Sequence, residues 1–271
     1  MWTFAIQSNL APGETFAEKV ERLAGWGFDG VEVSGADLLQ HGEALRQAVA
    51  GSPVRVTSAC AGFDGWLVDP NPRARNLAIA QIKEMLAVGA ELGTAGLVSP
   101  AAYGISARGV LPPYRYALSL GEERQLLVEG LQQIAESAAR TGGILLLEPL
   151  NRYVDRVINT LAEAASVIEE VGSPHIKMAP DIFHMNIEEA DLAGSLAAHA
   201  AHIGHVHLSD SNRRLPGQGH VDWPRIFAAL HGSGYAGVLA VECRIDGDAD
   251  VDVPCSLRFL RQMAQPPPPP L

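Results

Sequence analysis

The chain is short of cysteine and of long apolar stretches, and each shortage excludes a class of protein. Its three cysteines, Cys60, Cys243 and Cys255, are odd in number and form no CxxC pair, which argues against a disulfide framework and fits a reducing compartment. No window reaches the roughly 18 apolar residues that a membrane span needs. The first residues also lack the basic start and apolar stretch of a signal peptide. We therefore predict a cytoplasmic protein with no membrane partner.

Positive charge and phosphate-binding motifs are scarce as well. The 20 basic residues are outnumbered by 31 acidic ones, and the net charge of −11 disfavours non-specific binding to nucleic acid or to an anionic membrane. No GxGxxG or Walker-type loop occurs in the sequence. We predict no nucleic-acid partner, whereas a small anionic substrate is compatible with this charge because one arginine can dominate a pocket.

The sequence does contain a regular alternation of short apolar runs and longer amphipathic segments. Eight runs have the length of strands, at residues 3–7, 30–34, 54–59, 96–100, 144–148, 176–181, 203–207 and 238–242. Helical apolar spacing occurs between and after them, at residues 16–26, 36–49, 73–92, 122–140, 161–171, 192–202, 223–230 and 256–263. Eight such pairs predict an α/β protein with a single (β/α)8 TIM barrel over residues 1–265. An open, doubly wound sheet is the alternative.

Two segments interrupt this alternation. Residues 101–120 form a long connection whose aromatic content favours a pocket wall or lid; it contains Tyr103, Tyr114, Arg115 and Tyr116. Residues 266–271 are five prolines and a leucine, and prolines cannot donate backbone hydrogen bonds. We predict an extended, disordered tail there.

Acidic or histidine side chains stand at the ends of four successive apolar runs in the second half. These residues are Glu148, Asp181, His207 and Glu242, at intervals of 33, 26 and 35 residues. Because the carboxyl ends of barrel strands converge on one face, we expect the four side chains to meet. Three carboxylates and one imidazole favour Mn²⁺, Mg²⁺ or Co²⁺ over the thiolate-bound zinc of structural sites. The sequence therefore predicts one divalent-metal site.

Other polar residues near these strand ends are candidates for binding a substrate. His184 follows Asp181 by three residues, and Arg213 lies after the seventh expected strand, where its guanidinium suits a hydroxyl, carbonyl or carboxylate. Cys60 ends the third expected strand and either lines the pocket or fills space as a small buried residue. His205 shares a strand face with His207 but lies deeper, so we expect it to support the site rather than bind the ion.

Four stretches resemble one superfamily of barrels, the xylose-isomerase-like proteins, and the last points to its ketose 3-epimerases. They are Glu148-Pro-Leu-Asn-Arg-Tyr153, Asp181-Ile-Phe-His-Met-Asn-Ile-Glu-Glu189, Gly204-His-Val-His-Leu208 and Asn212-Arg-Arg-Leu-Pro-Gly-Gln-Gly-His-Val-Asp-Trp223. The first half of the chain matches only in its barrel rhythm. The resemblance implies an epimerase or isomerase that acts on tagatose, psicose or related free sugars, as a homodimer or homotetramer.

The resemblance also implies a mechanism. Glu148, Asp181, His207 and Glu242 would bind one divalent ion, Mn²⁺ or Co²⁺ in this family, and Glu148 and Glu242 would be the acid/base pair. The ion would stabilise a cis-enediolate formed when the C3 proton leaves. One glutamate would remove that proton and the other would return one from the opposite face, which inverts C3. His184 and Arg213 match positions that hold the substrate near its carbonyl.

One departure from the family pattern concerns the substrate. The position after Asn-Arg-Tyr that usually carries a glutamate is Val154 here, and Asp155 comes next. We expect Asp155, together with Cys60 and Tyr103, to contact the substrate. A valine cannot accept a hydroxyl hydrogen bond, so a sugar acid held by Arg213 is a second candidate substrate. The alternative function is a lyase or decarboxylase that uses the same metal.

Overall fold

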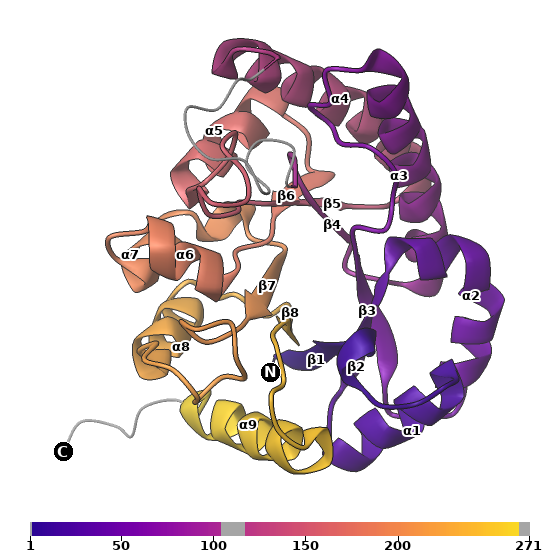
Figure 1. The fold of residues 1–271 in the computed structure, drawn as a ribbon, viewed down its shortest axis with the longest axis vertical. Helices are drawn as coiled ribbons and strands as arrows, with labels where there is room; N and C mark the ends of the chain where they lie inside the picture. Colours follow the sequence, from indigo (N-terminus) through magenta and orange to yellow (C-terminus); the bar gives the residue numbers. More distant parts are fainter. Residues whose placement is uncertain (1, 104–116, 266–271) are drawn as a thin grey trace.

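The computed structural model describes residues 2–103 and 117–265. Within them, eight parallel strands form one sheet in the order β6-β5-β4-β3-β2-β1-β8-β7, with helices around it (Figure 1). The strands are β1 (Thr3–Gln7), β2 (Gly30–Ser34), β3 (Arg55–Cys60), β4 (Leu97–Pro100), β5 (Leu145–Glu148), β6 (Ile176–Met178), β7 (His205–Leu208) and β8 (Val238–Val241). The predicted (β/α)8 barrel is confirmed, and the doubly wound alternative is wrong.

Nine α-helices and two 3₁₀ helices connect and follow the strands in the described ranges. The α-helices are α1 (Phe16–Trp26), α2 (Gly35–Val49), α3 (Pro72–Leu92), α4 (Leu120–Thr141), α5 (Leu161–Val171), α6 (Ile182–Glu188), α7 (Leu192–Ala198), α8 (Trp223–Gly232) and α9 (Ala249–Met263). The 3₁₀ helices are η1 (Ser8–Leu10) and η2 (Ala200–His202). Several of these starts follow from the sequence, because capping boxes satisfy the free amides of a first turn. They are formed by Thr15 with Glu18, Ser119 with Glu122, and Thr160 with Glu163.

The barrel closes between β6 and β7 through isolated bridges rather than through a continuous ladder. Met178 pairs with Ile203, and Asp181 pairs with His207. The His207 amide donates a hydrogen bond to the carbonyl of Pro180 at 2.8 Å. This closure brings Asp181 and His207 side by side at the carboxyl ends of the strands.

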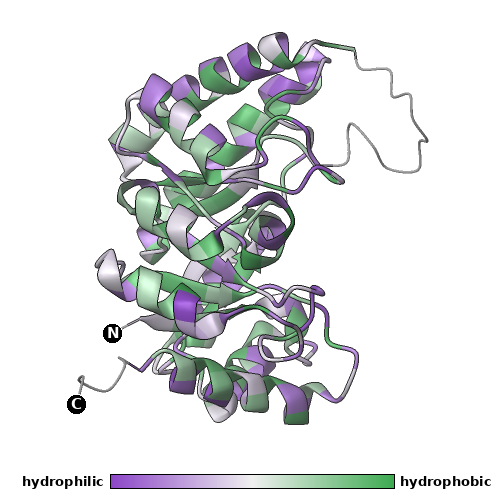
Figure 2. Cartoon of the chain, turned by 90° about the vertical axis from the view of Figure 1, so that its left-hand side faces the viewer, coloured by the Kyte–Doolittle hydropathy of each residue, from purple (hydrophilic) through white to green (hydrophobic). Residues whose placement is uncertain are grey.

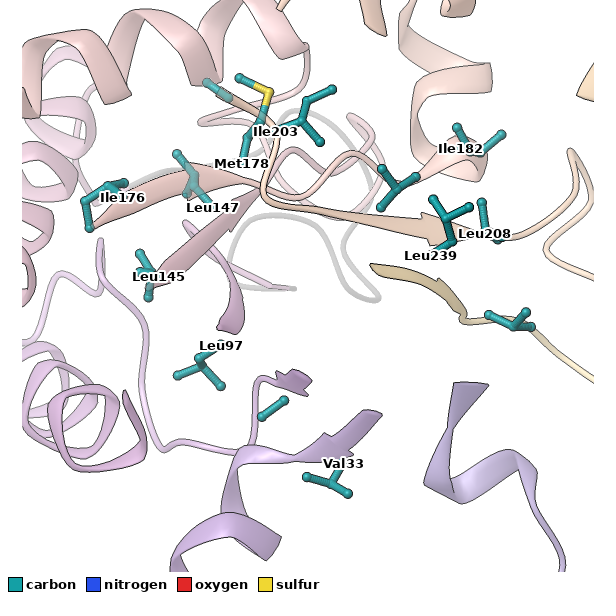
Figure 3. Packing of buried hydrophobic residues seen from close by; sticks show 14 of the residues in the cluster. Val33, Leu97, Leu145, Leu147, Ile176, Met178, Ile182, Ile203, Leu208 and Leu239 are labelled. Atoms are coloured by element: carbon teal, nitrogen blue, oxygen red, sulfur yellow. The ribbon is translucent and has the colours of Figure 1, made fainter. Parts of the chain in front are cut away.

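Strand residues alternate between two faces, as the pleat requires. Outward residues pack under the helices in one large core, part of which is shown in Figure 3, including Val33, Leu97, Leu145 and Leu208. The helices accordingly carry both hydrophobic and hydrophilic residues along their length (Figure 2). The inward residues are small and apolar near the start of the strands, as at Ala5, Val238 and Ala240. Toward the strand ends they become polar, and the functional candidates lie there.

Three helical segments differ from the sequence prediction. Helix α9 begins seven residues before the expected residue 256, because Asp248 caps it and the helix continues past Pro254. The segment expected to be one helix over 192–202 is divided at His199, whose φ and ψ are −111° and 13°. Helix α6 was not predicted; the Asp181 side chain accepts its first amide hydrogen bonds, so β6 ends earlier than expected.

Two sequence predictions concern segments that the structure describes only in part or not at all. Tyr114, Arg115, Tyr116 and residues 266–271 lie outside the described residues. Among the described helices, none is both long and apolar enough to cross a membrane. The first and last helices lie next to each other, and Arg22 of α1 pairs with Asp250 of α9 (Figure 1).

Candidate metal centre and substrate cavity

Four strand ends deliver the predicted residues to one point. Glu148 is the last residue of β5, Glu242 directly follows β8, His207 lies in β7, and Asp181 follows β6 as the cap of α6. One ligand atom from each of the four lies within 4.8 Å of the others. The structure thus brings together the four residues that the sequence singled out.

His207 lies at the centre of this group, and its two ring nitrogens face different partners. Nδ1 is 3.0 Å from Glu148 Oε1 and 2.9 Å from Glu242 Oε2. Nε2 is 3.0 Å from Glu32 Oε1. A proton on Nε2 that is donated to Glu32 leaves the Nδ1 lone pair free to bind an ion between the two glutamates, the usual way in which a carboxylate orients a ligand histidine.

Glu32 is a site residue that the sequence prediction missed. It lies in the middle of β2, and its carboxylate is fully buried. Besides His207, it contacts His205 Nε2 at 3.1 Å and accepts hydrogen bonds from Ser58 Oγ at 2.8 Å and Gln7 Nε2 at 3.1 Å. Burial raises its pKa, but His207 and His205 lower it further, so the net pKa is well below the ordinary value. The sequence feature that could have revealed this residue is a glutamate between two valines in a strand. Strand alternation places the glutamate on the face opposite the valines, which is the inside of the barrel.

Arg213 places a positive charge beside the carboxylates. Its guanidinium pairs with Asp181 and, through Nη2, lies 3.0 Å from Glu242 Oε2. It also lies over the ring of Phe183, 5.1 Å from the centroid. The backbone of Arg213 has the left-handed φ of 62°, which the surrounding loop must impose because such a φ is unfavourable for a residue with a Cβ.

Asp210 organises that loop. Its carboxylate accepts hydrogen bonds from the amides of Ser211, Gly217 and Val221 at 2.8 to 3.1 Å, and from Trp223 Nε1 at 3.1 Å. A Cβ at residue 219 would collide with the same carboxylate, so the loop requires glycine there. The loop that carries Arg213 is therefore built around one buried acid.

Replacing Asp210 with alanine should lower the free energy of unfolding by about 2–3 kcal/mol, because four donors lose a charged acceptor. Thermal and urea denaturation would measure the loss. Asp210→Asn retains one acceptor oxygen and should lie between the wild type and the alanine variant. The exposed Asp222→Ala, which removes a helix cap instead, serves as the control and should cost about 1 kcal/mol. An alanine variant as stable as the wild type would contradict this account of the loop.

The electrostatics of the group fit a divalent cation. Burial is the largest cause that raises the pKa of Glu148 to about 7. Burial also raises the pKa of Glu242, but His207 and Arg213 lower it more, so the net pKa falls below the ordinary value. Glu242 Oε2 has no partner in hydrogen-bond geometry among the described residues, although two nitrogens lie close to it. A hard cation would neutralise this crowded, oxygen-rich set.

Glu32, Cys60 and His207 form a second group with ligand atoms within 4.8 Å. A thiol binds metal as its thiolate. Burial, followed by the neighbouring carboxylates, raises the pKa of the Cys60 thiol well above its ordinary value. This group is therefore a weaker candidate than the four residues around His207 Nδ1.

A cavity of about 540 Å³ opens above the four residues. Its volume is within the range of small-molecule sites. Glu148 and Glu242 form part of its floor, and the walls include Cys60, Trp66, Tyr103, Val154, His184 and Arg213. Cys60, Tyr103, His184 and Arg213, which the sequence predicts as substrate-binding residues, thus all line this cavity.

Asp155 is placed differently from the expectation. The cavity wall contains Val154, but Asp155 is not among the described residues that line it. The Asp155 carboxylate is buried and accepts hydrogen bonds from the amides of Arg156 and Val157 at 2.6 and 3.0 Å. Burial raises its pKa to about 7. Asp155 therefore supports the loop after β5, and Val154 is the residue of this pair that lines the cavity.

His184 presents a defined hydrogen-bond donor to the cavity. The backbone amide of Asn151 donates to His184 Nδ1 at 2.9 Å, so the ring proton resides on Nε2. Burial lowers the pKa of His184, which keeps the ring neutral. A neutral imidazole with its Nε2 proton available can donate a hydrogen bond to a hydroxyl or carbonyl oxygen next to Arg213.

Comparison with known proteins identifies the family of this chain and several of its relatives. A family model described as xylose isomerase-like TIM barrel matches residues 20–263. A 3-dehydro-D-guloside 4-epimerase of Escherichia coli (strain K12) is 39% identical over 86% of this chain and 88% of that protein. An L-ribulose 3-epimerase of Mesorhizobium japonicum is 33% identical over 80% of this chain and 71% of its own.

A solved structure gives the same result. The crystal structure of the apo 3-keto-D-glucoside 4-epimerase from E. coli superposes with a TM-score of 0.93 at 36% identity, covering 97% of this chain and all of the other. The fold and the family model therefore agree. The chain belongs to the xylose isomerase-like TIM barrel family.

Proposed function

We propose that this protein is a divalent-metal-dependent sugar epimerase that inverts a hydroxyl-bearing carbon next to a ketone. The observation that carries the proposal is the placement of Glu148 and Glu242. Glu148 ends β5 and Glu242 directly follows β8, and they approach the same nitrogen of His207 at 3.0 and 2.9 Å. Two carboxylates that flank one point at the floor of a cavity can exchange protons with one substrate carbon.

The residues divide the chemistry as follows. Glu148, Asp181, His207 and Glu242 would hold one divalent ion, Mn²⁺ in our proposal, which when bound would polarise the ketone and lower the cost of negative charge on its oxygen. One of the two glutamates removes the proton from the carbon next to the ketone, which produces an enediolate. The other returns a proton to the opposite face, and the carbon is inverted.

His184 and Arg213 position the sugar in this scheme. The Nε2 proton of His184 and the guanidinium of Arg213 both face the cavity beside Asp181. Both are donors, so they would bind the oxygens on which negative charge increases as the proton leaves. Trp66 and Tyr103, whose ring centroids are 6.1 Å apart, form an aromatic wall for the sugar ring.

The relatives narrow the class of reaction. The curated proteins named above are epimerases, which confirms the prediction of a carbohydrate isomerase. A 4-epimerase of a 3-keto sugar and a 3-epimerase of a 2-keto sugar carry out the same chemistry, because each inverts a carbinol carbon beside a ketone. We propose this chemistry rather than the lyase alternative, for which these relatives give no support.

Proton exchange in D₂O tests the proposal. Protein loaded with Mn²⁺ should incorporate deuterium at the carbon next to the ketone of methyl 3-dehydro-D-glucopyranoside or of D-fructose, as measured by NMR, and should form the epimer. Removing the metal with EDTA should reduce exchange to the background rate, and Mn²⁺ should restore it. No exchange with either substrate would refute the epimerase, and release of water or carbon dioxide would favour the lyase.

A further inference from the structure

A second cavity lies on the same face of the barrel. It has a volume of about 290 Å³ and is lined at the carboxyl ends of β1, β2 and β3 by residues that include Gln7, Ser8, Asn9, Lys19 and Cys60. Cys60 also lines the cavity above Glu148 and Glu242. The two cavities therefore adjoin each other at Cys60, and a ligand longer than one sugar could reach both.

The second cavity contains polar groups that have no partner among the residues 2–103 and 117–265. Ser8 is only 7% exposed, yet its hydroxyl takes part in no hydrogen bond among the described residues. The side chains of the exposed Asn9 and the half-buried Lys19 also have no hydrogen-bond or ion-pair partner among those residues. These side chains are open to the cavity, so a ligand there could replace the water that they would otherwise bind. These groups can thus bind hydroxyl oxygens.

Gln7 is oriented for the same purpose. Its Nε2 donates to Glu32 at 3.1 Å, so its Oε1 remains available as an acceptor. Gln7 Oε1 can accept a hydrogen bond, the Asn9 amide can donate and accept one, and Lys19 can donate one. Sugar hydroxyls both donate and accept hydrogen bonds, so this set of side chains suits them. Because Glu32 orients both Gln7 and His207, the polar cavity is held rigidly against the reaction site.

The charge around this cavity favours a neutral ligand. Of the described residues that line it, Lys19 is the only basic one, whereas Glu32 and Asp37 are acidic. Ser34 and Asp37 engage each other at 2.8 Å and form part of the cap of α2. Because Glu32 is paired with His205 and His207, the lining is left with one positive and one negative charge. It therefore offers a phosphate or carboxylate no excess of positive charge, whereas an uncharged polyol needs none.

We propose that the cavity of Gln7, Ser8, Asn9 and Lys19 binds a second, neutral sugar unit that is joined to the keto sugar by a glycosidic bond. This inference rests on the proposed function. The keto ring would lie above Glu148 and Glu242, and the attached sugar would pass Cys60 into the second cavity. The loss of a hydroxyl-binding carboxylate at Val154 is consistent with a substrate held from this other side.

Binding of unreactive sugars tests the cavity independently of catalysis. Maltose, with two rings, should bind the Mn²⁺-loaded protein at least tenfold more tightly than methyl α-D-glucopyranoside, with one ring, in NMR titrations. Ser8→Ala and Asn9→Ala should each weaken maltose binding about fivefold and leave the one-ring sugar unchanged. Gln133→Ala, on the exposed face of α4, is the matched control. Equal affinities for the two sugars, or equal losses for both in the variants, would overturn the proposal.

Turnover of one-ring and two-ring substrates then distinguishes the proposed epimerase activity from the proposed second sugar site. 3-Dehydromaltose should have a higher kcat/KM than its one-ring methyl glycoside, and Asn9→Ala should raise KM only for the two-ring substrate. If the binding pattern holds but no substrate exchanges its proton, the epimerase is wrong and the second sugar site stands. If exchange occurs with equal kcat/KM for one and two rings, the epimerase stands and the second sugar site is wrong.

Discussion

Replacing Glu242 with glutamine is expected to lower the rate of proton exchange by about 10²–10⁴-fold, the usual contribution of a positioned general acid or base. Glutamine has the same shape and keeps one carbonyl oxygen, but it can neither accept nor return a proton at pH 7. Sugar binding should remain, since Arg213 and His184 also contact the cavity. The pre-steady-state loss of deuterium from substrate, measured by NMR, follows the affected step directly.

Glu242 is also a candidate metal ligand, so the test must separate two effects. Electron paramagnetic resonance of free Mn²⁺ gives the affinity for the ion, and the exchange rate is then compared at saturating Mn²⁺. Glu129→Gln, an exposed glutamate on α4, is the matched control and should behave like the wild type. A Glu242→Gln variant that retains exchange within threefold of the wild type at saturating metal would remove Glu242 from the acid/base pair.

Replacing Glu32 with alanine is expected to weaken Mn²⁺ binding by about 10–100-fold, as found for carboxylates that orient ligand histidines. The change deprives His207, His205, Ser58 and Gln7 of their shared acceptor. Breaking a buried ion pair by removing one partner typically costs about 3–5 kcal/mol, so the melting temperature should fall as well.

Glu32→Gln provides the comparison, because glutamine keeps the shape and one acceptor oxygen. It should recover most of the stability and only part of the metal affinity, since an amide holds the Nε2 proton of His207 less strongly than a carboxylate. Calorimetric titration with Mn²⁺ and thermal denaturation give the two quantities separately. Unchanged Mn²⁺ affinity in both variants would show that Glu32 stabilises the barrel without orienting His207.

The sequence was sufficient for the barrel and for the strand-end residues because both depend on local periodicity. Glu148 and Glu242 each follow an apolar run that could only be a buried strand, and a barrel delivers such ends to one face. Glu32 was missed for the opposite reason. Its partner His207 lies 175 residues later, and only the closed ring shows that a glutamate between two valines points at a histidine.

The other differences between the sequence pattern and the structure have a similar origin. Val154 and Asp155 are neighbours in sequence, but the turn after β5 directs the first to the cavity and the second to the amides of Arg156 and Val157. A sequence indicates which residue types are close together, but not which way an irregular loop turns each one. Helix α6 does not follow from the sequence pattern because Asp181 both ends an apolar run and caps a helix.

The incomplete pairing between β6 and β7 has a mechanical consequence. Six of the seven other strand neighbours share a ladder of three or more residues, but this junction depends on isolated bridges at Met178 and Asp181. Asp181 and His207, which face each other across the junction, are two of the four residues proposed to hold the ion. An ion bound there would crosslink the β6 and β7 sides of the barrel where their backbone pairing is incomplete. The reaction centre and the closure of the barrel would then be strengthened or loosened together.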